Sequence, residues 1–203
     1  MKLVEAIDLL TETYNLDYST LNAEATDWTI GGYHPEPDAQ KWPIGSVFGV
    51  EGQIIRALAK SIESKIIVNL GVAHGCSLMH LAQTGAKVYA VDHNISLVDQ
   101  KAFKDYDVEF VESDAIEFIK EWSGRKKIDF LFEDLDHETE SVTDVWVEAM
   151  PKIRKGGFIV SHDSEHYVVG ERVILGLALA GVSDVTRLLI EPSDCGLAVW
   201  RNE

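Results

Sequence analysis

The sequence predicts a single α/β domain: a doubly wound, Rossmann-like sheet of seven mostly parallel strands with helices on both faces. From residue 46 onward, short apolar runs alternate with segments of helical spacing. The runs are apolar at consecutive positions rather than at every second one, which indicates strands covered on both faces. Such strands, separated by helices, are typical of a parallel sheet built from strand–helix–strand units.

The expected elements follow one another in a regular order. They are helix 46–63, strand 65–70, helix 75–83, strand 87–92, helix 95–103, strand 108–113, helix 114–122, strand 128–134, helix 138–153, strand 157–163 and helix 165–179. The last two apolar runs, 184–191 and 196–201, are separated only by PSDC. Because that gap is too short for a helical crossover, these two strands are expected to pair antiparallel, with the last strand reversed.

Residues 1–45 are expected to form an N-terminal helix and an irregular segment in front of the main domain, 46–203. The first helix is amphipathic, with apolar residues on one side at Leu3, Ile7, Leu10 and Tyr14. The irregular part, 15–45, is rich in proline and glycine and carries the aromatic residues Trp28, Tyr33 and Trp42. Two interpretations stay open for it: an ordered wrap over the sheet edge or a neighbouring subunit, and a lid or substrate loop.

Composition narrows the classes of function. Lys and Arg total 18 against 34 Asp and Glu, which gives a net charge of −16. This disfavours a nucleic-acid partner, because such binding depends on cationic side chains. No apolar run approaches the ~20 residues of a membrane span, and the N-terminus lacks the features of a signal peptide. With two cysteines and no C-x-x-C pair, a reduced, cytoplasmic protein is expected.

Every expected parallel strand ends in a carboxylate or a carboxamide. In open α/β sheets, ligands bind beyond the carboxyl ends of the strands. Polar groups from five strand ends should therefore meet at one rim: Asn69–Gly71, Asp92, Ser113–Asp114, Glu133–His137 and His162–Asp163. Five such ends in register are hard to explain as chance, and they predict a ligand site at this rim.

The loop after the first strand narrows the choice of ligand. A pyrophosphate loop has three glycines, as G-x-G-x-x-G, and here these positions are Gly71, Ala73 and Cys76, with an additional Gly75. One tight turn with little phosphate cradle suits a nucleoside joined to an uncharged linker. Asp92 follows Gly71 by 21 positions, the spacing at which an acidic residue binds ribose hydroxyls.

Asp114 begins a helix directly after a strand, and two roles for it are compatible. It can cap that helix. Its side chain, or the backbone of Asp114 and Ala115, could also meet an adenine amino group.

Several segments, taken in order, resemble the successive motifs of class I S-adenosylmethionine-dependent methyltransferases. They are VNLGVAHGCSLMHLA, VESDAIEF, DFLFEDLDHETE and RKGGFIVSHD, together with Asp92. The resemblance covers about residues 46–203 and is nearest to the small-molecule O-methyltransferases, the catechol-O-methyltransferase-like proteins and the related group with a D-x-D-H signature. It implies S-adenosylmethionine as cofactor and a small-molecule acceptor, and it is compatible with a homodimer.

The resemblance also implies roles for single residues. Those implied for cofactor binding are Asn69, Gly71, Ala73, Gly75, Asp92, His93, Asp114, Ala115 and Glu133. In metal-dependent members, a divalent cation such as Mg²⁺ is held at positions that match Asp134 and Asp163. The third ligand position, often Asn or Asp in the family, is Ser164 here. The general base falls on His137, beside Asp134.

The chemistry of these residue types agrees with O-methylation. A cation held by oxygen ligands can lower the pKa of an acceptor hydroxyl, and histidine accepts protons near neutral pH. The residues that could build such a site are Asp134, Asp136, His137, His162 and Asp163. Three alternatives stay open: a metal-independent N-methyltransferase for a cationic amine, an NAD-dependent oxidoreductase, against which the missing glycines count, and a non-catalytic nucleoside-binding protein.

Overall fold

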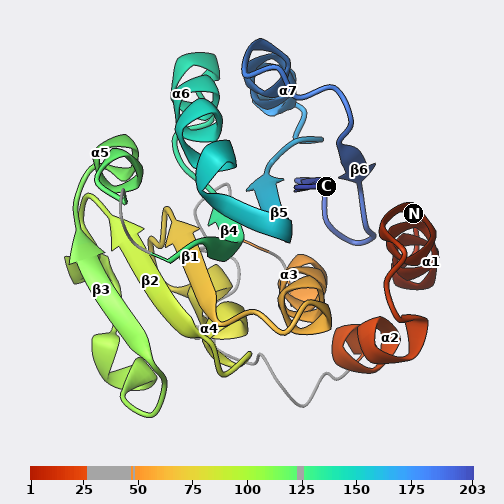
Figure 1. The fold of residues 1–203 in the computed structure, drawn as a ribbon, viewed down its shortest axis with the longest axis horizontal. Coiled ribbons are helices and arrows are strands. Elements are labelled where there is room, and N and C mark those ends of the chain that lie inside the picture. The colour runs from red at the N-terminus through yellow and green to blue at the C-terminus, as the bar shows by residue number, and fades with distance from the viewer. Residues whose placement is uncertain (27–46, 48, 123–125) are drawn as a thin grey trace.

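A computed structural model describes residues 1–26, 47, 49–122 and 126–203. One sheet runs through the molecule (Figure 1), with strands in the order β3-β2-β1-β4-β5-β7-β6. The strands are β1 (Ile66–Leu70), β2 (Lys87–Asp92), β3 (Val108–Glu112), β4 (Ile128–Glu133), β5 (Ile153–His162), β6 (Thr186–Leu188) and β7 (Leu197–Arg201). The pairs among β1 to β5 are parallel, and β7 is antiparallel to both β5 and β6. The predicted seven-stranded sheet with a reversed last strand is confirmed.

Helices cover both faces of this sheet. They are α1 (Leu3–Tyr14), α2 (Tyr18–Thr26), α3 (Gly49–Ser61), α4 (Cys76–Ala82), α5 (Ala115–Lys120), α6 (Thr139–Ala149) and α7 (Gly170–Leu179). Helices α1 to α4 share one apolar core with strand residues such as Ile67 and Phe130. Helices α5 to α7 share a second core with Val68 and Leu131. Neighbouring residues of one strand thus enter opposite cores, which explains why the strands are continuously apolar.

Three expected helices have different boundaries in the structure. Residues 95–103 form two short 3₁₀ helices, Ile95–Leu97 and Gln100–Phe103, because Asp99 accepts the N–H of Lys101 and so interrupts a longer helix. The helix expected over 138–153 ends at Ala149, followed by a 3₁₀ turn and then β5; Pro151 lies in that turn and cannot continue the α-helical hydrogen bonding. The helix expected from 165 begins at Gly170, since a turn follows β5.

The N-terminal segment is more regular than expected. Helix α1 buries Ile7, Leu10 and Tyr14, as its spacing predicted, and the Tyr14 hydroxyl donates to the carbonyl of Val199 at 2.6 Å. A second helix, α2, occupies residues that were expected to be irregular. The expected lid or wrap with its three aromatic residues falls on 27–46, outside the described residues.

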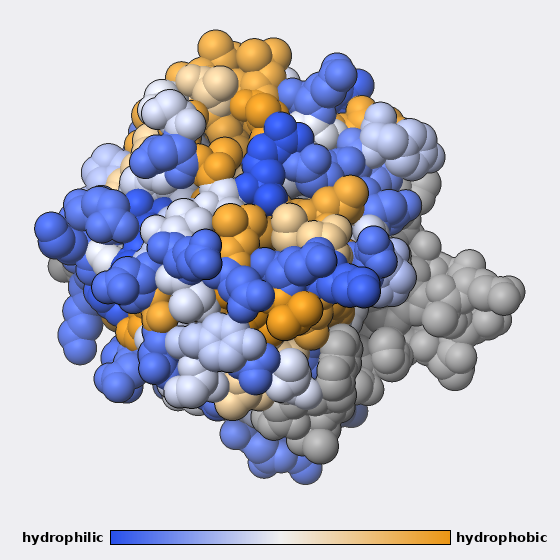
Figure 2. All heavy atoms as spheres, turned by 90° about the vertical axis from the view of Figure 1, so that its right-hand side faces the viewer, coloured by the Kyte–Doolittle hydropathy of each residue, from blue (hydrophilic) through white to orange (hydrophobic). Residues whose placement is uncertain are grey.

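The surface shows no membrane-spanning element among the helices that the structure describes, since none is long and apolar enough. The face on the side of α1 and β6 is mostly hydrophilic, with apolar side chains gathered toward its upper edge (Figure 2). Helix α7 exposes Leu175 and Leu179. The expected homodimer stays a prediction.

Candidate active site

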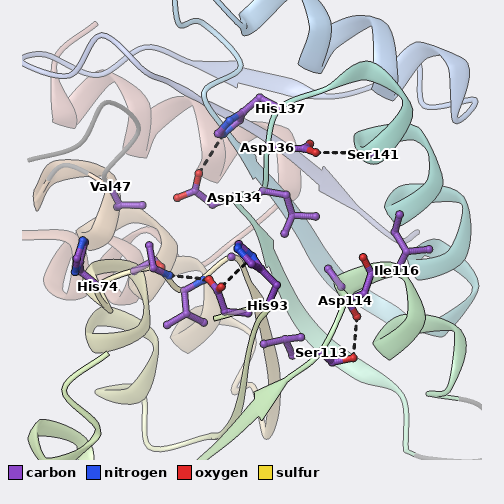
Figure 3. Close-up of a pocket in the computed structure, with 18 of the residues that line it drawn as sticks. Val47, His74, His93, Ser113, Asp114, Ile116, Asp134, Asp136, His137 and Ser141 are labelled. Carbon is purple, nitrogen blue, oxygen red and sulfur yellow. Dashed lines mark hydrogen bonds and ion pairs between the residues drawn. The ribbon is translucent and has the colours of Figure 1, made fainter. Parts of the chain in front are cut away.

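A pocket of about 450 Å³ opens at the carboxyl ends of the parallel strands (Figure 3). The loops after β1, β2, β3 and β4 all contribute to its wall. The lining includes Gly71–His74, Asp92, His93, Ser113–Ile116 and Asp134–His137. Residues after four of the five strand ends that were expected to meet at one rim thus line this pocket, whereas His162 and Asp163 are not among its lining residues.

Gly71 sets the shape of the first loop. Its φ is +80°, and a Cβ atom at this position would lie 1.9 Å from the backbone oxygen of Asp134. Glycine is needed both for the left-handed backbone and for this close approach. The loop after β1 consequently lies directly against the end of β4, which also carries His137.

Asp92 organises the same loop. Its Oδ2 accepts the N–H groups of Val72 and Ala73, each at 2.9 Å, and its Oδ1 accepts the N–H of Asn94 at 2.9 Å. His93 Nδ1 lies 3.2 Å from the same Oδ1. Since an oxygen of a carboxylate has two lone pairs, Oδ2 is saturated by the loop, while Oδ1 is engaged by Asn94 and His93. The sequence did not predict this loop-holding role.

Asp114 caps helix α5, as predicted, with its side chain accepting the N–H of Glu117 at 2.9 Å. Ala115 and Ile116 follow it in the pocket wall. The expected contact with an adenine amino group stays a prediction. The side chain of Asp114 and the backbone of Asp114 and Ala115 are the groups that could make it.

Two of the expected cofactor-binding residues are buried behind the pocket. Asn69 donates from Nδ2 to Ser77 Oγ at 3.1 Å. Glu133 accepts from the hydroxyl of Ser161 and from the N–H of Leu135, and burial raises its pKa. These contacts support the floor of the site, and a direct contact of either residue with a cofactor stays a prediction.

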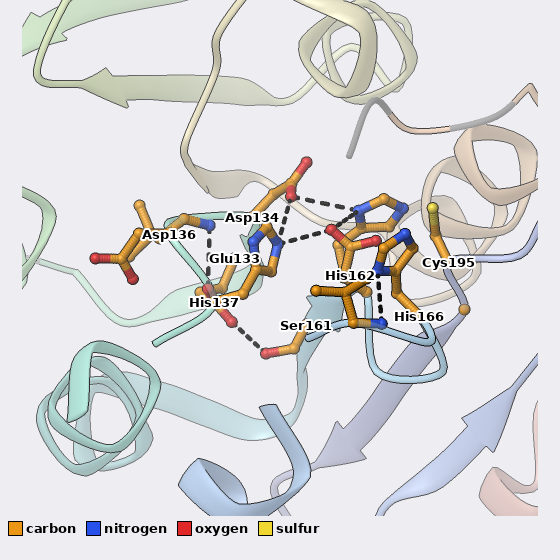
Figure 4. Close-up of polar contacts among 12 residues, drawn as sticks. Glu133, Asp134, Asp136, His137, Ser161, His162, His166 and Cys195 are labelled. Carbon is orange, nitrogen blue, oxygen red and sulfur yellow. Dashed lines mark hydrogen bonds and ion pairs between the residues drawn. The ribbon is translucent and has the colours of Figure 1, made fainter. Parts of the chain in front are cut away.

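Four side chains at the ends of β4 and β5 form a compact group, here termed the Asp–His cluster: Asp134, His137, His162 and Asp163 (Figure 4). One ligand atom from each lies within 4.8 Å of all the others. His137 Nε2 is 3.2 Å from Asp134 Oδ1 and 2.9 Å from Asp163 Oδ2. His162 Nδ1 is 3.3 Å and 3.5 Å from the same two oxygens.

The cluster is held under backbone strain. His137 has φ of 59° and Asp163 has φ of 56°, left-handed values that cost a non-glycine residue about 1–3 kcal/mol. Asp163 follows β5 directly and His137 lies four residues after the end of β4, and their side chains meet at 2.9 Å. Strain of this kind collects at functional sites.

The charges in the cluster stabilise one another. Burial alone would lower the pKa of His137, but its hydrogen bonds to Asp134 and Asp163 outweigh burial and raise this pKa to about 10. The same two carboxylates raise the pKa of His162 well above its ordinary value against the effect of burial. Burial would raise the pKa of Asp163, yet the two imidazoles hold it well below its ordinary value. Both rings are therefore charged at neutral pH when no cation is bound.

Behind the cluster lies Glu51 of helix α3. Its Oε2 is 3.1 Å from His162 Nε2, and its Oε1 accepts from Ser193 Oγ at 2.6 Å and from the N–H of Gly196 at 2.9 Å. Glu51 and His162 are both completely buried. This contact was not predicted from the sequence, where its signal is a glutamate within the mostly apolar segment GVEGQII.

Ser164, the expected third metal ligand, is buried, and its Oγ has no hydrogen-bond partner in the part of the chain that the structure describes. Its role toward a metal stays a prediction.

Comparison with known proteins gives a family model and several similar structures. Residues 68–164 match the model of a family described as a methyltransferase domain. No curated protein matches the sequence. Among solved structures, the O-methyltransferase from Bacillus cereus in complex with SAH shares 14% identity with a TM-score of 0.64, and the match covers 96% of each chain.

Two further structures match over nearly their whole lengths. The O-methyltransferase TomG from Streptomyces achromogenes, involved in tomaymycin synthesis and in complex with SAM, has 17% identity and a TM-score of 0.63, covering 98% of this chain and 96% of that one. Cofactor-bound Rv0187 from MTB has 18% identity and a TM-score of 0.66, covering 98% and 95%. Residues 68–164 thus match a methyltransferase domain family, and the chain has the fold seen in O-methyltransferases that are solved with SAH or SAM.

Proposed function

We propose that this protein transfers the methyl group of S-adenosylmethionine to a hydroxyl oxygen of a small molecule, with a divalent cation at the Asp–His cluster. The observation that carries the proposal is the contact between Gly71 and Asp134. This contact supports the proposal because the loop after β1 and two members of the cluster, Asp134 and His137, line the same pocket.

The loop after β1 supports S-adenosylmethionine as the cofactor. Its few glycines offer little cradle for a pyrophosphate, whereas Asp92 and His93 line the pocket and are the polar groups that would meet ribose hydroxyls. SAH or SAM is bound in two of the solved structures that share the fold.

The donor set of the cluster fits a divalent cation. Asp163 Oδ1 and His162 Nδ1 are buried and have no hydrogen-bond partner within the described residues, and buried polar atoms of that kind call for a ligand. Asp134 and Asp163 would hold the cation, which would act as a Lewis acid that lowers the pKa of the acceptor hydroxyl.

His137 is placed to take the proton of that hydroxyl. It lines the pocket, together with Asp134, whereas His162 is fully buried behind it. The carboxylates that raise the pKa of His137 would be engaged by a bound cation, and the ring would then lose the interactions that keep it protonated. In this proposal, His137 acts as a base only when a cation is bound at the Asp–His cluster. The methyl transfer itself depends on in-line positioning of the acceptor oxygen and the methyl group.

The net charge of the protein favours a small molecule over RNA as the methyl acceptor. A putative rRNA methylase from Clostridium thermocellum also shares the fold, with 14% identity, a TM-score of 0.59 and coverage of 78% of this chain and 100% of that one, so the fold does not choose the acceptor. The net charge of −16 opposes an RNA backbone. A cytoplasmic location stays a prediction.

A second candidate is metal-independent N-methylation. It is favoured by the mutual neutralisation of the two imidazoles and the two carboxylates, which needs no cation, and by the acidic side chain of Asp136 in the pocket wall.

The test is the formation of SAH from S-adenosylmethionine with panels of small hydroxyl compounds, small amines and RNA, each with Mg²⁺, with Mn²⁺ and with EDTA. We expect turnover with a hydroxyl compound that EDTA abolishes, and a loss of at least 100-fold in His137→Gln. Turnover with an amine that EDTA leaves intact would establish the second candidate instead. Methylation of RNA alone would contradict both.

A further inference from the structure

We infer that His162 is a metal ligand through Nδ1, oriented by Glu51, and that this nitrogen makes the cluster select a first-row transition dication over Mg²⁺. The inference rests on the proposed function only in placing a cation at the Asp–His cluster. It adds a ligand that the resemblance does not provide and a different class of metal.

His162 presents its Nδ1 atom to the two carboxylates of the cluster. The ring is completely buried at the end of β5, and Nδ1 makes no hydrogen bond in the described part of the chain. It nevertheless lies 3.3 Å from Asp134 Oδ1 and 3.5 Å from Asp163 Oδ2. A dication between these three atoms would take the place of the proton on Nδ1 and would contact one nitrogen and two carboxylate oxygens.

The other ring nitrogen of His162, Nε2, faces Glu51. Nε2 of His162 lies 3.1 Å from Glu51 Oε2. A proton on Nε2 directed at this carboxylate leaves the lone pair on Nδ1, facing the cluster. Metal-binding histidines commonly have a carboxylate on their second nitrogen, which fixes the tautomer and the ring orientation.

Glu51 is itself fixed. Its Oε1 accepts from Ser193 Oγ and from the N–H of Gly196, in the loop between β6 and β7. Three parts of the chain, α3, the end of β5 and the last hairpin, therefore hold one imidazole in place. A histidine that only filled the core would not need a buried carboxylate with three donors around it.

The mixture of oxygen and nitrogen ligands determines which cation the cluster prefers. Mg²⁺ is bound almost entirely by oxygen, whereas imidazole suits transition metals. Asp134 and Asp163 supply oxygen, and His162 supplies nitrogen. Ser164, at the position where the resembled family has an amide or a carboxylate, offers only a hydroxyl. A site of two carboxylates and one imidazole should bind Co²⁺ and Mn²⁺ more tightly than Mg²⁺.

The experiment uses the full chain, stripped with EDTA and free of cofactor. Calorimetric titrations with Mg²⁺, Mn²⁺ and Co²⁺ give affinities, and pulsed EPR of the Mn²⁺ complex detects nitrogen bound to the metal. We expect Mn²⁺ to bind at least 10-fold more tightly than Mg²⁺ and the spectrum to show a ¹⁴N coupling. The coupling should persist in His137→Gln and vanish in His162→Gln, which separates the two rings of the cluster.

Two further variants sharpen the test. Glu51→Gln should lower Mn²⁺ affinity about 10-fold, because Glu51 is a positioning residue. His166→Gln, a nearby histidine outside the cluster (Figure 4), should leave both affinity and coupling unchanged. If His162→Gln fails to fold, the spectrum of His137→Gln decides alone, since a ¹⁴N coupling there supports His162 and its absence refutes it.

A ¹⁴N coupling that survives in His162→Gln, or equal affinities for Mn²⁺ and Mg²⁺, would overturn the inference. No binding of any cation would also overturn it, together with the cation part of the proposed function. Binding of SAH by the same metal-free protein is measured separately, so failure of the metal site and failure of the methyltransferase assignment give different results.

Discussion

The backbone oxygen of Asp134 lies where a side chain on Gly71 would have to be, 1.9 Å from the position of a Cβ atom. Gly71 begins the loop after β1, and Asp134 follows β4, the neighbouring strand. This contact joins the two halves of the site, because the loop held by Asp92 and the Asp–His cluster lie on opposite sides of it.

Gly71→Ala should therefore damage both fold and site. An alanine with φ of +80° costs about 1–2 kcal/mol, and forcing apart a tight contact adds about 1–3 kcal/mol. We expect a loss of about 3 kcal/mol in the free energy of unfolding, measured in urea, and loss of SAH binding. The matched control is Gly85→Ala, since Gly85 has φ of +81° and nothing within 4 Å of its would-be Cβ. Equal losses in the two variants would contradict the role of the Asp134 contact.

Asp92→Asn should weaken the binding of SAH at least 10-fold. Asparagine has one acceptor oxygen in place of two, so it cannot accept the loop N–H groups and that of Asn94 together, and hydrogen bonds to a charged group contribute about 1.5–3 kcal/mol each. Calorimetry checks the affinity. Asp99→Asn is the control, because Asp99 is exposed and accepts only the nearby N–H of Lys101. An unchanged affinity in Asp92→Asn would remove Asp92 from the site.

The metal-free protein should lose stability as the pH rises from about 6.5 to about 10. The pKa of His137 is raised from 6.5 to about 10 in the folded chain, so through this range only the folded state keeps the proton and the stabilisation falls. The pKa of Asp163 is lowered from 3.8, so its contribution is lost instead as the pH falls below about 4. Melting temperatures in EDTA should peak between these limits, and His137→Gln should flatten the alkaline decline. A melting temperature that rises between pH 6.5 and 9 would contradict this assignment.

Ser161→Ala should destabilise the floor of the site by about 3 kcal/mol. Ser161 Oγ donates to Glu133 and accepts from Trp146 Nε1, the latter at 2.9 Å, and each buried partner left unpaired costs about 1–3 kcal/mol. Glu133→Gln keeps an oxygen for Ser161 and should cost less, which denaturant unfolding will show. The same variant tests the expected cofactor contact of Glu133, because a structural role leaves SAH affinity within twofold of the parent protein.

Much of this fold could be predicted from short stretches of the sequence. The strands were predictable because each is buried on both faces, so consecutive apolar residues mark it without any long-range information. The rim was predictable for a similar reason, since parallel strands bring their carboxyl ends to one side. Asp134 and Asp163 stood out because each directly follows such a strand, whereas the role expected for His137 came from the resemblance to the methyltransferases.

Other features depend on contacts between distant segments. Glu51 and His162 are 111 positions apart, and only the fold of the whole chain brings their side chains together. The local hydrogen bond of Asp99 outweighed the apolar spacing that predicted a helix over 95–103. The hydrogen bonds of Asp92 to the loop after β1 could not be predicted. In a sequence, a carboxylate at a strand end looks the same whether it binds a ligand or backbone N–H groups.

The central claim, a nucleoside site made for S-adenosylmethionine, is tested most directly by a calorimetric titration of the purified protein with SAH beside NAD. The account predicts micromolar binding of SAH, weakened at least 10-fold by Asp92→Asn, and no binding of NAD. Tight binding of NAD, or binding of neither compound, would contradict the interpretation of the Gly71 loop and of every cofactor contact that follows from it.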